Sequence, residues 1–318
     1  VLLDSHEMSL PELFGAYMLH HRLAEGTTSE VFLAQTTGDF PRLCAVKRIR
    51  PDVAGLPGFA ERFRRDAALL VRLIHGNLVQ VLEVGSVEER LFVAMEQLDG
   101  VSLPALVDDP GLQDAPLPPE AALYVGIELC EAIGYIQSQR RGVDGGITVA
   151  ADAAWPLEVM LTFDGVVKVI DLGSFGALHI GQQRVARLFQ SPGYAAPEVI
   201  LRRSLDLRSD LFALGLTLWE LLPGERLVAT DPEGYVRSVL DGAWRAPAVT
   251  RKDVSGDVLR LVAQLLALDP GDRPDDLGDV RSRLVQALRR VAPAYGSADL
   301  SRLLGRRCRR QIARAANL

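Results

Sequence analysis

The chain has 318 residues, of which 48% are apolar and 24% charged, and its net charge at pH 7 is −6. These ordinary globular values exclude a largely disordered chain, and the length allows one or two domains. No apolar run approaches the roughly 18 residues of a membrane-spanning helix, and the first residues lack signal-peptide features, so we expect a cytoplasmic protein.

The first hundred residues have the pattern of short strands around one helix. Glu30–Ala34 and Leu43–Lys47 are rich in β-branched and apolar residues, which predicts two strands. Phe59–Leu73 has apolar residues at three-to-four spacing, which predicts a helix. Two more strands are predicted at Leu78–Val84 and Leu91–Met95. This part of the chain is therefore expected to be β-rich.

Beyond a turn predicted at Asp99-Gly100, the chain becomes mostly helical. Ala121–Gln137 is apolar on most sides, which predicts a buried helix. Phe163-Asp164-Gly165 lies between two apolar segments and predicts a β-hairpin. Further helices are predicted at Leu211–Leu222, Val258–Leu268 and Val280–Val291. The sequence thus predicts an α+β protein with a small β-rich lobe and a larger, mostly helical lobe.

The three cysteines, Cys44, Cys130 and Cys308, are far apart and lack the spacing of metal ligands. The five histidines form no cluster either. We expect buried, unreactive thiols, and a metal-hydrolase function has no support in the sequence.

A series of short motifs follows the predicted elements in a fixed order. They are Ala24–Val31, Cys44–Lys47, His75–Val79, Asp171-Leu172-Gly173, Ser191–Glu198, Ser209–Gly215 and Asp269–Pro274. Their order and spacing, from Leu23 to Arg273, resemble those of bacterial Hanks-type Ser/Thr protein kinases. The resemblance implies a two-lobed kinase fold. Its parts would be an N-terminal extension (1–16), an N-lobe (17–95), a hinge (96–100), a C-lobe (101–291) and a basic amphipathic helix (292–318).

The resemblance also implies a site for ATP and Mg²⁺. Only Gly26 remains of the three glycines that let a loop close over phosphates. Lys47 would bind the α- and β-phosphates and pair with an acid on the following helix, here Asp66. The nucleotide-binding residues implied by the family pattern are Gly26, Val31, Ala45, Lys47, Asp66, Met95 at the gatekeeper position, Glu96 and Leu98 in the hinge, and Met160.

The catalytic loop departs from the family pattern. Counting back from Val159–Gly165, with Pro156 supporting the register, Ala153 stands where the family has the catalytic Asp. That carboxylate orients the attacking hydroxyl and accepts its proton. Asp152 lies one residue early, where an extended loop would point it away from the site. Glu158 replaces the metal-binding Asn.

The metal-binding Asp of the family is kept as Asp171. With Glu158 nearby, two carboxylates would face a triphosphate, and without a metal they repel it. Mg²⁺ prefers oxygen ligands, so Glu158 could bind it together with Asp171. We therefore expect any ATP binding to depend on Mg²⁺.

These departures favour a pseudokinase, a regulatory protein of kinase fold whose phosphoryl transfer is lost or strongly impaired. One alternative is a weakly active Ser/Thr kinase that uses Asp152. Another is nucleotidyl transfer to protein, which can dispense with the usual Asp. For a pseudokinase, we expect a protein partner such as an active kinase.

Residues 292–318, the tail, predict an amphipathic helix that could have one of two roles. Leu300, Leu303, Leu304, Cys308 and Ile312 share one face, and arginines cover the rest. From Val280 onward the net charge is +9, which leaves about −15 on the remainder. The helix would pack on the acidic large lobe, or dock on an acidic partner or membrane surface. Nucleic acid is disfavoured because no aromatic residues alternate with the arginines.

Overall fold

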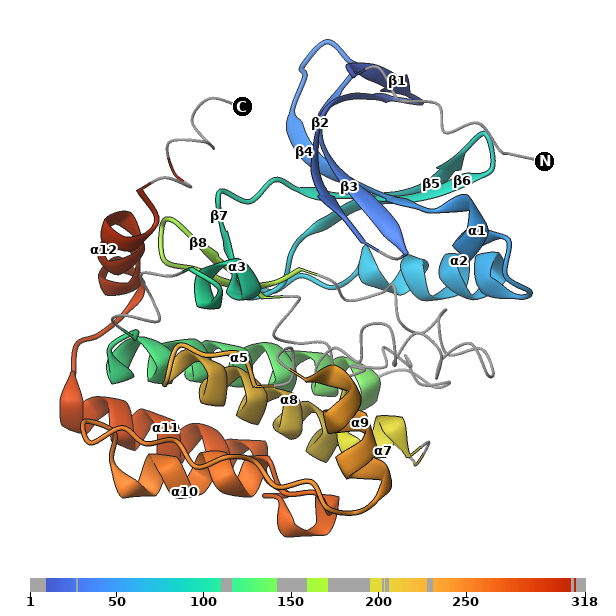
Figure 1. Ribbon diagram of the computed structural model, residues 1–318. Helices are drawn as coiled ribbons and strands as arrows, with labels where there is room; N and C mark the ends of the chain where they lie inside the picture. Colours follow the sequence, from blue (N-terminus) through green and yellow to red (C-terminus); the bar gives the residue numbers. More distant parts are fainter. Residues whose placement is uncertain are drawn as a thin grey trace. The chain divides into compact units, whose positions relative to one another are not determined.

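The computed structural model describes residues 10–26, 28–109, 116–141, 159–170, 195–201, 203, 206–227, 231–309 and 312. The chain forms two compact units (Figure 1). The first unit contains the described residues up to Ile74 and those from Val79 to Leu98. The second contains His75–Leu78 and the described residues from Asp99 onward.

The first unit is an antiparallel sheet with two helices. The strand order is β1-β2-β3-β4-β6-β5. The strands are β1 (Glu12–Phe14), β2 (Tyr17–Glu25), β3 (Ser29–Thr36), β4 (Leu43–Ile49), β5 (Val81–Val87) and β6 (Arg90–Glu96), and the helices are α1 (Pro51–Ala54) and α2 (Phe59–Leu70). Strand β1 comes from the segment that the sequence assigned to an N-terminal extension.

One face of this sheet carries a compact apolar core. Strand residues alternate between faces, so every second side chain points into it. Its members are Phe14, Tyr17, Leu19, Phe32, Ala34, Cys44, Val46, Phe92 and Ala94. The rings of Phe14 and Tyr17 each meet Phe92 edge-on, with centroids 5.5 Å apart. The opposite face therefore carries the intervening residues.

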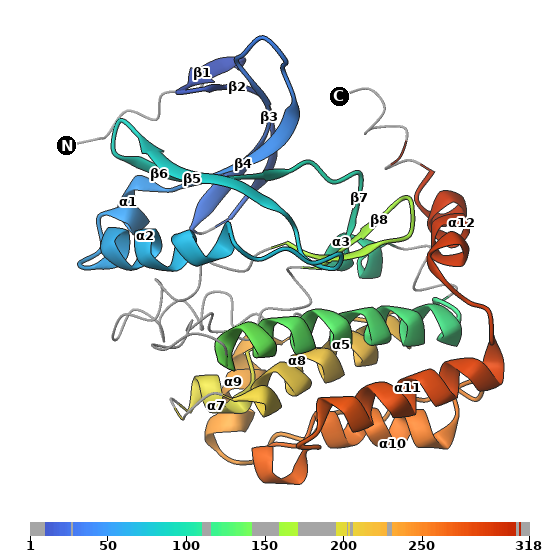
Figure 2. The ribbon, with the colours of Figure 1, turned by 180° about the vertical axis from the view of Figure 1, so that it is seen from behind.

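The second unit combines a small sheet with a set of helices (Figure 2). The sheet joins β7 (Gly100–Ser102), β8 (Val159–Thr162) and β9 (Val167–Val169). The helices are α3 (Leu103–Val107), α5 (Pro119–Arg141), α7 (Pro197–Ile200), α8 (Leu207–Leu221), α9 (Pro232–Leu240), α10 (Gly256–Leu265), the 3₁₀ turn η2 (Pro270–Asp272), α11 (Leu277–Val291) and α12 (Ser297–Arg307). Residues Ser209 to Leu221 of α8 are all buried, which explains why that helix is apolar on every side.

The turn predicted at Asp99-Gly100 is wrong. Gly100 begins β7, and a Cβ there would lie 2.5 Å from the Leu161 carbonyl oxygen. Glycine is therefore needed for the close approach of two strands rather than for a turn.

Strand β5 begins three residues later than predicted. Leu78 instead forms a parallel bridge with Val169 of β9, and the Val169 N–H donates to the Asn77 carbonyl at 2.8 Å. Residues His75–Leu78 consequently belong to the second unit. The predicted hairpin at Phe163-Asp164-Gly165 is confirmed, because β8 pairs with β9 across it.

A buried ion pair connects helices α7 and α8 with the η2 turn in the second unit. The guanidinium of Arg273 binds both carboxylate oxygens of Glu198, at 2.8 and 2.9 Å, and both side chains are almost fully buried. Arg273 also donates to the carbonyls of Ala267 and Arg208, each at 2.9 Å. The guanidinium of Arg273 also lies over the ring of Phe212. One side chain thus ties together α7, α8 and the turn at η2.

The pKa of Glu198 reflects this arrangement. Burial by itself raises the pKa, but the hydrogen bonds and charge of Arg273 outweigh it and hold the pKa below its ordinary value. A lowered folded pKa means that the pair stabilises the fold fully above about pH 4.3, the ordinary glutamate value. The contribution is lost as the pH falls through the lowered value.

Replacing Arg273 with Met should lower the free energy of unfolding by about 3–5 kcal/mol, because it leaves the Glu198 carboxylate buried without a counter-charge. Urea unfolding followed by tryptophan fluorescence measures this, since Trp219 and Trp244 lie in the second unit. The matched control is Arg260→Met, which breaks an exposed pair with Asp257 and should cost less than about 1 kcal/mol. Equal losses in the two variants would contradict this role for Arg273.

Candidate functional site

The candidate nucleotide-binding residues of the first unit share one face of its sheet. Val31 lies opposite Lys47, which lies opposite Val93, and Ala45 lies opposite Met95. Because β-strand side chains alternate, these residues all point away from the apolar core described above. The structure thus brings together four of the residues that the sequence singled out: Val31, Ala45, Lys47 and Met95.

This face places one cation among apolar side chains. Lys47 is 8% exposed, and Ala45, Val93 and Met95 around it are also buried. A buried ammonium is costly unless it has a negative partner. Asp66 lies on α2, but its side chain is outside the described residues, so its pairing with Lys47 stays a prediction.

Gly26 lies at the tip of the β2–β3 hairpin. Its N–H donates to the Ser29 carbonyl at 2.8 Å, and the Arg50 N–H donates to the Thr28 carbonyl at 2.9 Å. A Cβ at Gly26 would only reach ordinary contact, 3.5 Å from the Ser29 oxygen. The described part of the hairpin therefore does not itself require glycine at this position.

Glu96, at the end of β6 and in the predicted hinge, also makes hydrogen bonds that hold this strand end in place. Glu96 ends β6 opposite Cys44, on the core face. Its carboxylate accepts the Gln80 N–H at 2.9 Å, and its own N–H donates to the Gln80 carbonyl at 2.9 Å. Leu98 follows, half-buried. Nucleotide binding by Glu96 and Leu98, which the kinase resemblance implies, stays a prediction.

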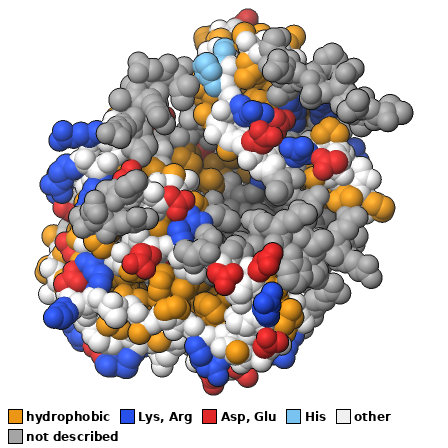
Figure 3. Space-filling view, viewed as in Figure 1, with side chains coloured by type: hydrophobic (Ala, Val, Ile, Leu, Met, Phe, Trp, Pro, Cys, Tyr) orange, Lys and Arg blue, Asp and Glu red, His pale blue; other side chains and the backbone are white. Residues whose placement is uncertain are grey.

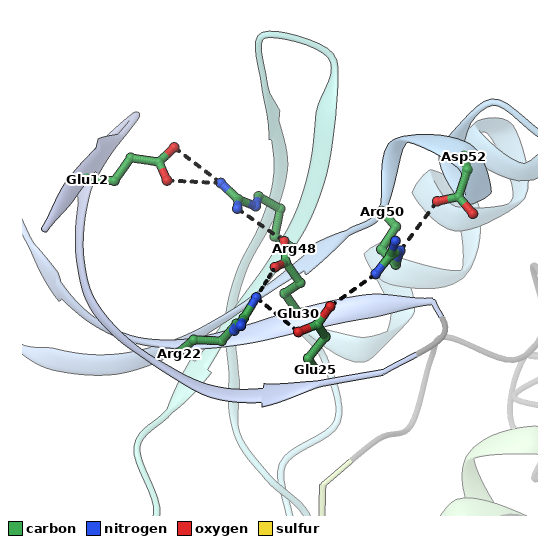
Figure 4. Close-up of polar contacts among 7 residues, drawn as sticks. All are labelled: Glu12, Arg22, Glu25, Glu30, Arg48, Arg50 and Asp52. Carbon is green, nitrogen blue, oxygen red and sulfur yellow. Dashed lines mark hydrogen bonds and ion pairs between the residues drawn. The ribbon is translucent and has the colours of Figure 1, made fainter. Parts of the chain in front are cut away.

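An ion network on the opposite face holds the same hairpin (Figure 4). Arg48 lies directly opposite Glu30, and its guanidinium contacts Glu30 and Glu12, each at 3.2 Å. Its plane lies over the Phe32 ring, 4.8 Å from the centroid. The Arg48 side chain is only 3% exposed. Two carboxylates and an aromatic ring thus replace the water that this cation loses on burial.

The network continues to the strand residues beside Gly26. Arg22 contacts Glu25 at 3.0 Å and Glu30 at 3.2 Å. Arg50 contacts Glu25 at 3.4 Å and Asp52 at 3.5 Å. Three arginines therefore neutralise the two carboxylates that flank the hairpin tip. This network was not predicted from the sequence, although the opposite charges of Glu30 and Arg48 in two neighbouring predicted strands were a signal for it.

Met160 belongs to the second unit, on β8, where it pairs with Lys168 and is half-buried. The Lys168 ammonium donates to the Leu78 carbonyl at 3.1 Å. The Asn77 amide donates to Glu128 at 2.8 Å and to the Val167 carbonyl at 3.1 Å. The residues around Met160 are thus held by polar contacts that link β9, α5 and the 75–78 segment.

The candidate catalytic and metal-binding residues Asp152, Ala153, Glu158 and Asp171 lie outside the described residues. Among those that the structure does describe, no group of three or more His, Cys, Asp or Glu could hold a metal ion. Of the described helices, none has both the length and the apolar character to cross a membrane.

The three thiols are free and buried, as predicted. Burial raises the pKa of Cys130 to about 12 and that of Cys308 to about 11. Thiols that stay protonated at neutral pH are poor nucleophiles and metal ligands.

The apolar face of the tail helix is used within the second unit. Leu300, Leu303, Leu304 and Cys308 are buried, whereas Arg302, Arg306 and Arg309 are exposed. On the face of the molecule drawn in Figure 3, acidic and basic side chains of described residues are interspersed.

Known proteins match this chain over most of its length. Residues 17–281 match the family model of the protein kinase domain. The serine/threonine-protein kinase PknB of Mycobacterium tuberculosis is 30% identical over 278 residues, 85% of this chain and 42% of PknB. The tyrosine-protein kinase MasK of Myxococcus xanthus is 29% identical over 264 residues, 82% of this chain and 41% of MasK. The chain thus spans less than half the length of these curated relatives.

A solved structure is similar as well. The kinase domain of Mycobacterium tuberculosis PknI aligns with a TM-score of 0.67 at 25% identity, over 88% of this chain and 98% of that one. The fold class predicted from the sequence, a small β-rich lobe and a larger helical lobe, is confirmed.

Replacing Arg48 with Met should destabilise the first unit by about 2–4 kcal/mol, because Glu30 and Glu12 lose their shared counter-charge in a largely buried place. Hydrogen exchange of β3 and β4 in increasing urea measures this unit alone. The control Arg22→Met removes a side chain that is 47% exposed and should cost less than about 1 kcal/mol. If Arg48→Met lowered the stability of the first unit as little as its control does, the network would contribute no more than an exposed ion pair, which would contradict its role in holding the hairpin.

Proposed function

The chain belongs to the protein kinase domain family, in its bacterial Hanks-type branch, and on that premise we propose that it is a pseudokinase. It would bind Mg-ATP but transfer phosphoryl groups poorly or not at all, and it would act by regulating a protein partner. The observation that carries this proposal is Ala153 at the position of the catalytic Asp.

The first unit offers residues that suit a nucleotide. Lys47 supplies a positive charge for phosphate oxygens on a face otherwise lined by apolar side chains, including Ala45 and Met95. Gly26 leaves backbone room at the hairpin tip that the hairpin does not need for itself. Apolar walls with a few placed polar groups are typical of cofactor sites. Bound Mg-ATP would supply the phosphoryl group that active members of the family transfer.

Loss of transfer follows from what the catalytic loop lacks. A methyl group at Ala153 can neither orient a substrate hydroxyl nor accept its proton. Positioned groups of this kind contribute about 10²–10⁴-fold to a rate. Asp171 is retained for the metal, and Glu158 would add a second carboxylate ligand. Binding and transfer would thus be separated in this chain.

A weakly active Ser/Thr kinase is the second candidate. It is favoured by the 30% identity to PknB, which is described as a serine/threonine-protein kinase. Asp152 would then have to turn toward the substrate to replace the missing carboxylate. The chain matches less than half the length of its curated relatives. The substrates and partners of the whole protein are therefore proposals as well.

A partner would meet the tail through its charged side. The apolar side of α12 is buried within the second unit, so the exposed Arg302, Arg306 and Arg309 are what an acidic partner would contact. We therefore propose a protein partner rather than insertion of this helix into a membrane, which needs a free apolar face.

Nucleotide binding should depend on Mg²⁺. We expect ATP with Mg²⁺ to raise the melting temperature by several degrees and ATP with EDTA to raise it much less, because ligands that bind the folded state stabilise it. Lys47→Met and Asp171→Ala should each abolish the shift, whereas the exposed control Lys252→Met should keep it. Equal shifts with and without Mg²⁺ would contradict the assigned metal role.

Labelled ATP separates the candidate functions. The chain should incorporate no more γ-labelled phosphate into itself or a general acceptor protein than its Asp171→Ala variant does. Ala153→Asp should raise incorporation at least about tenfold, because it restores a positioned base. Incorporation by the unmodified chain that Asp171→Ala abolishes would establish the weakly active kinase. Incorporation of α-label would indicate nucleotidyl transfer.

A further inference from the structure

Strand β1 (Glu12–Phe14) lies before the segment that matches the protein kinase family model, which begins at residue 17. It is nevertheless part of the sheet, because it pairs with β2 and places Glu12 opposite Leu19. Its buried side chain, Phe14, belongs to the apolar core of the first unit. This chain therefore completes that core with a strand that the family match does not cover.

The two edges of the sheet meet beside β1. In the strand order, β1 and β5 are the outermost strands. Gly15, just after β1, has a φ of +58°, and a Cβ there would lie 2.6 Å from the Cγ2 carbon of Val87 on β5. The Tyr17 hydroxyl donates to the carboxylate of Glu83, which also lies on β5. The sheet thus curls until its edges meet, with β1 as the closing strand.

Strand β1 contributes two contacts to the buried cation of Arg48. The guanidinium donates to both carboxylate oxygens of Glu12, at 3.2 and 3.3 Å (Figure 4). It also lies over the Phe14 ring, 5.6 Å from the centroid. A further N–H of the guanidinium donates to Glu30 on β3 at 3.2 Å. Because the Arg48 side chain is only 3% exposed, bulk water would not replace a lost Glu12 carboxylate at this cation.

The bridge from Glu12 through Arg48 to Glu30 ends beside the candidate nucleotide-binding residues. In the β3–β4 ladder, the pair of Glu30 with Arg48 is followed directly by the pair of Val31 with Lys47. Successive residues of a strand are only about 3.3 Å apart. A shift of Glu30 relative to Arg48 would therefore also shift Val31 relative to Lys47.

The same bridge holds the tip of the β2–β3 hairpin. Glu30 lies opposite Glu25 in the last pair of the β2–β3 ladder, and Gly26 follows Glu25. The carboxylate of Glu25 pairs with two arginines whose side chains are 47% and 40% exposed. Exposed ion pairs contribute little to stability. The largely buried bridge through Arg48 is therefore the main ionic contact that holds this tip.

We propose that β1 controls the nucleotide-binding face of the first unit through the bridge of Glu12, Arg48 and Glu30. With Glu12 bound to Arg48, the β2–β3 hairpin is held in place and ATP binds with full affinity. With β1 displaced, the hairpin loosens and the affinity falls. Glu12 is thus a positioning residue, because it acts on that face through Arg48. This inference rests on the proposed binding of Mg-ATP and adds to it a control by the strand that precedes the family match.

The test uses Glu12→Ala, which removes the contact, and Glu12→Gln, which keeps a hydrogen-bond acceptor but not the charge. Leu13→Ala is the matched control, because Leu13 points to the opposite face of β1 and is 64% exposed. Tyr17→Phe is a second control that removes the hydrogen bond to β5 and leaves the bridge intact. Two quantities are measured on the full chain: hydrogen exchange of residues 22–33, and the dissociation constant of ATP in Mg²⁺.

Glu12→Ala should speed exchange of the hairpin and weaken ATP binding about threefold to tenfold, as expected for the net contribution of one hydrogen bond. Glu12→Gln should have an intermediate effect, and both controls should leave the affinity unchanged. Unchanged exchange in Glu12→Ala, or faster exchange with unchanged affinity, would overturn the inference. An equal loss of affinity in Tyr17→Phe would overturn it too, because that indicates general loosening of the sheet.

A double variant separates positioning from a general loss of stability. If Glu12 acts through Arg48 on Glu30, Glu12→Ala should weaken ATP binding less in a Glu30→Ala background than in the unmodified chain, because the bridge is already broken there. Loss of the same factor in both backgrounds would show that Glu12 acts independently of the bridge, which would contradict the proposed route.

Gly15→Val displaces β1 while keeping all three residues of the bridge. The positive φ and the close approach of Val87 both exclude a β-branched side chain at this position. This variant should change exchange and affinity in the same direction as Glu12→Ala, and full retention of both would contradict the control by β1.

Failure of the proposed function gives a different result. The unmodified chain would then bind no ATP, which overturns the effect on affinity together with the proposed function. Hydrogen exchange of residues 22–33 in Glu12→Ala would still decide whether β1 holds the hairpin.

Discussion

Lys47 and Arg48 are adjacent cations in the same strand, and the alternation of β4 sends them to opposite faces of the sheet. Both are nearly buried, so each face must compensate a charge. Arg48 is compensated within the first unit, by Glu30, Glu12 and the Phe32 ring. Lys47 points to the other face, among Ala45, Val93 and Met95, where the candidate nucleotide-binding residues lie. Alternation along one strand thus separates the ion network that holds the β2–β3 hairpin from the face that is proposed to bind a nucleotide.

The second unit is held together by polar groups that take no part in the proposed chemistry. The Glu198–Arg273 pair and the contacts of Asn77 and Lys168 join helices and strands through buried or half-buried polar groups. None of these groups performs proton transfer in the proposed mechanism, so the substitution at Ala153 leaves them unaffected. In the proposed pseudokinase, stability and phosphoryl transfer would therefore depend on different residues.

Much of this could be predicted from the sequence. Strands and helices followed from apolar periodicity. The resemblance to the kinase family implied Val31, Ala45 and Lys47 as candidate residues, and the strand register places them on one face of the sheet. The errors have a common cause. Gly100 signals close strand contact rather than a turn, and Leu78 pairs with β9 instead of extending β5. Both depend on partners some 60 to 90 residues away, which local patterns do not encode.

The contact between Gly165 and α12 is a further example, because a Cβ on Gly165 would lie 1.9 Å from the carbonyl oxygen of Ser297. No local pattern links this hairpin turn to a residue that lies about 130 positions later in the sequence.

The proposed pseudokinase would bind Mg-ATP without transferring or hydrolysing its γ-phosphate. The most direct measurement is a ³¹P NMR time course of stoichiometric Mg-ATP with the purified chain. The account predicts phosphate resonances that are shifted by binding and stay intact over hours. Resonances of ADP appearing together with phosphate or a phosphoprotein, and absent with Asp171→Ala, would contradict it.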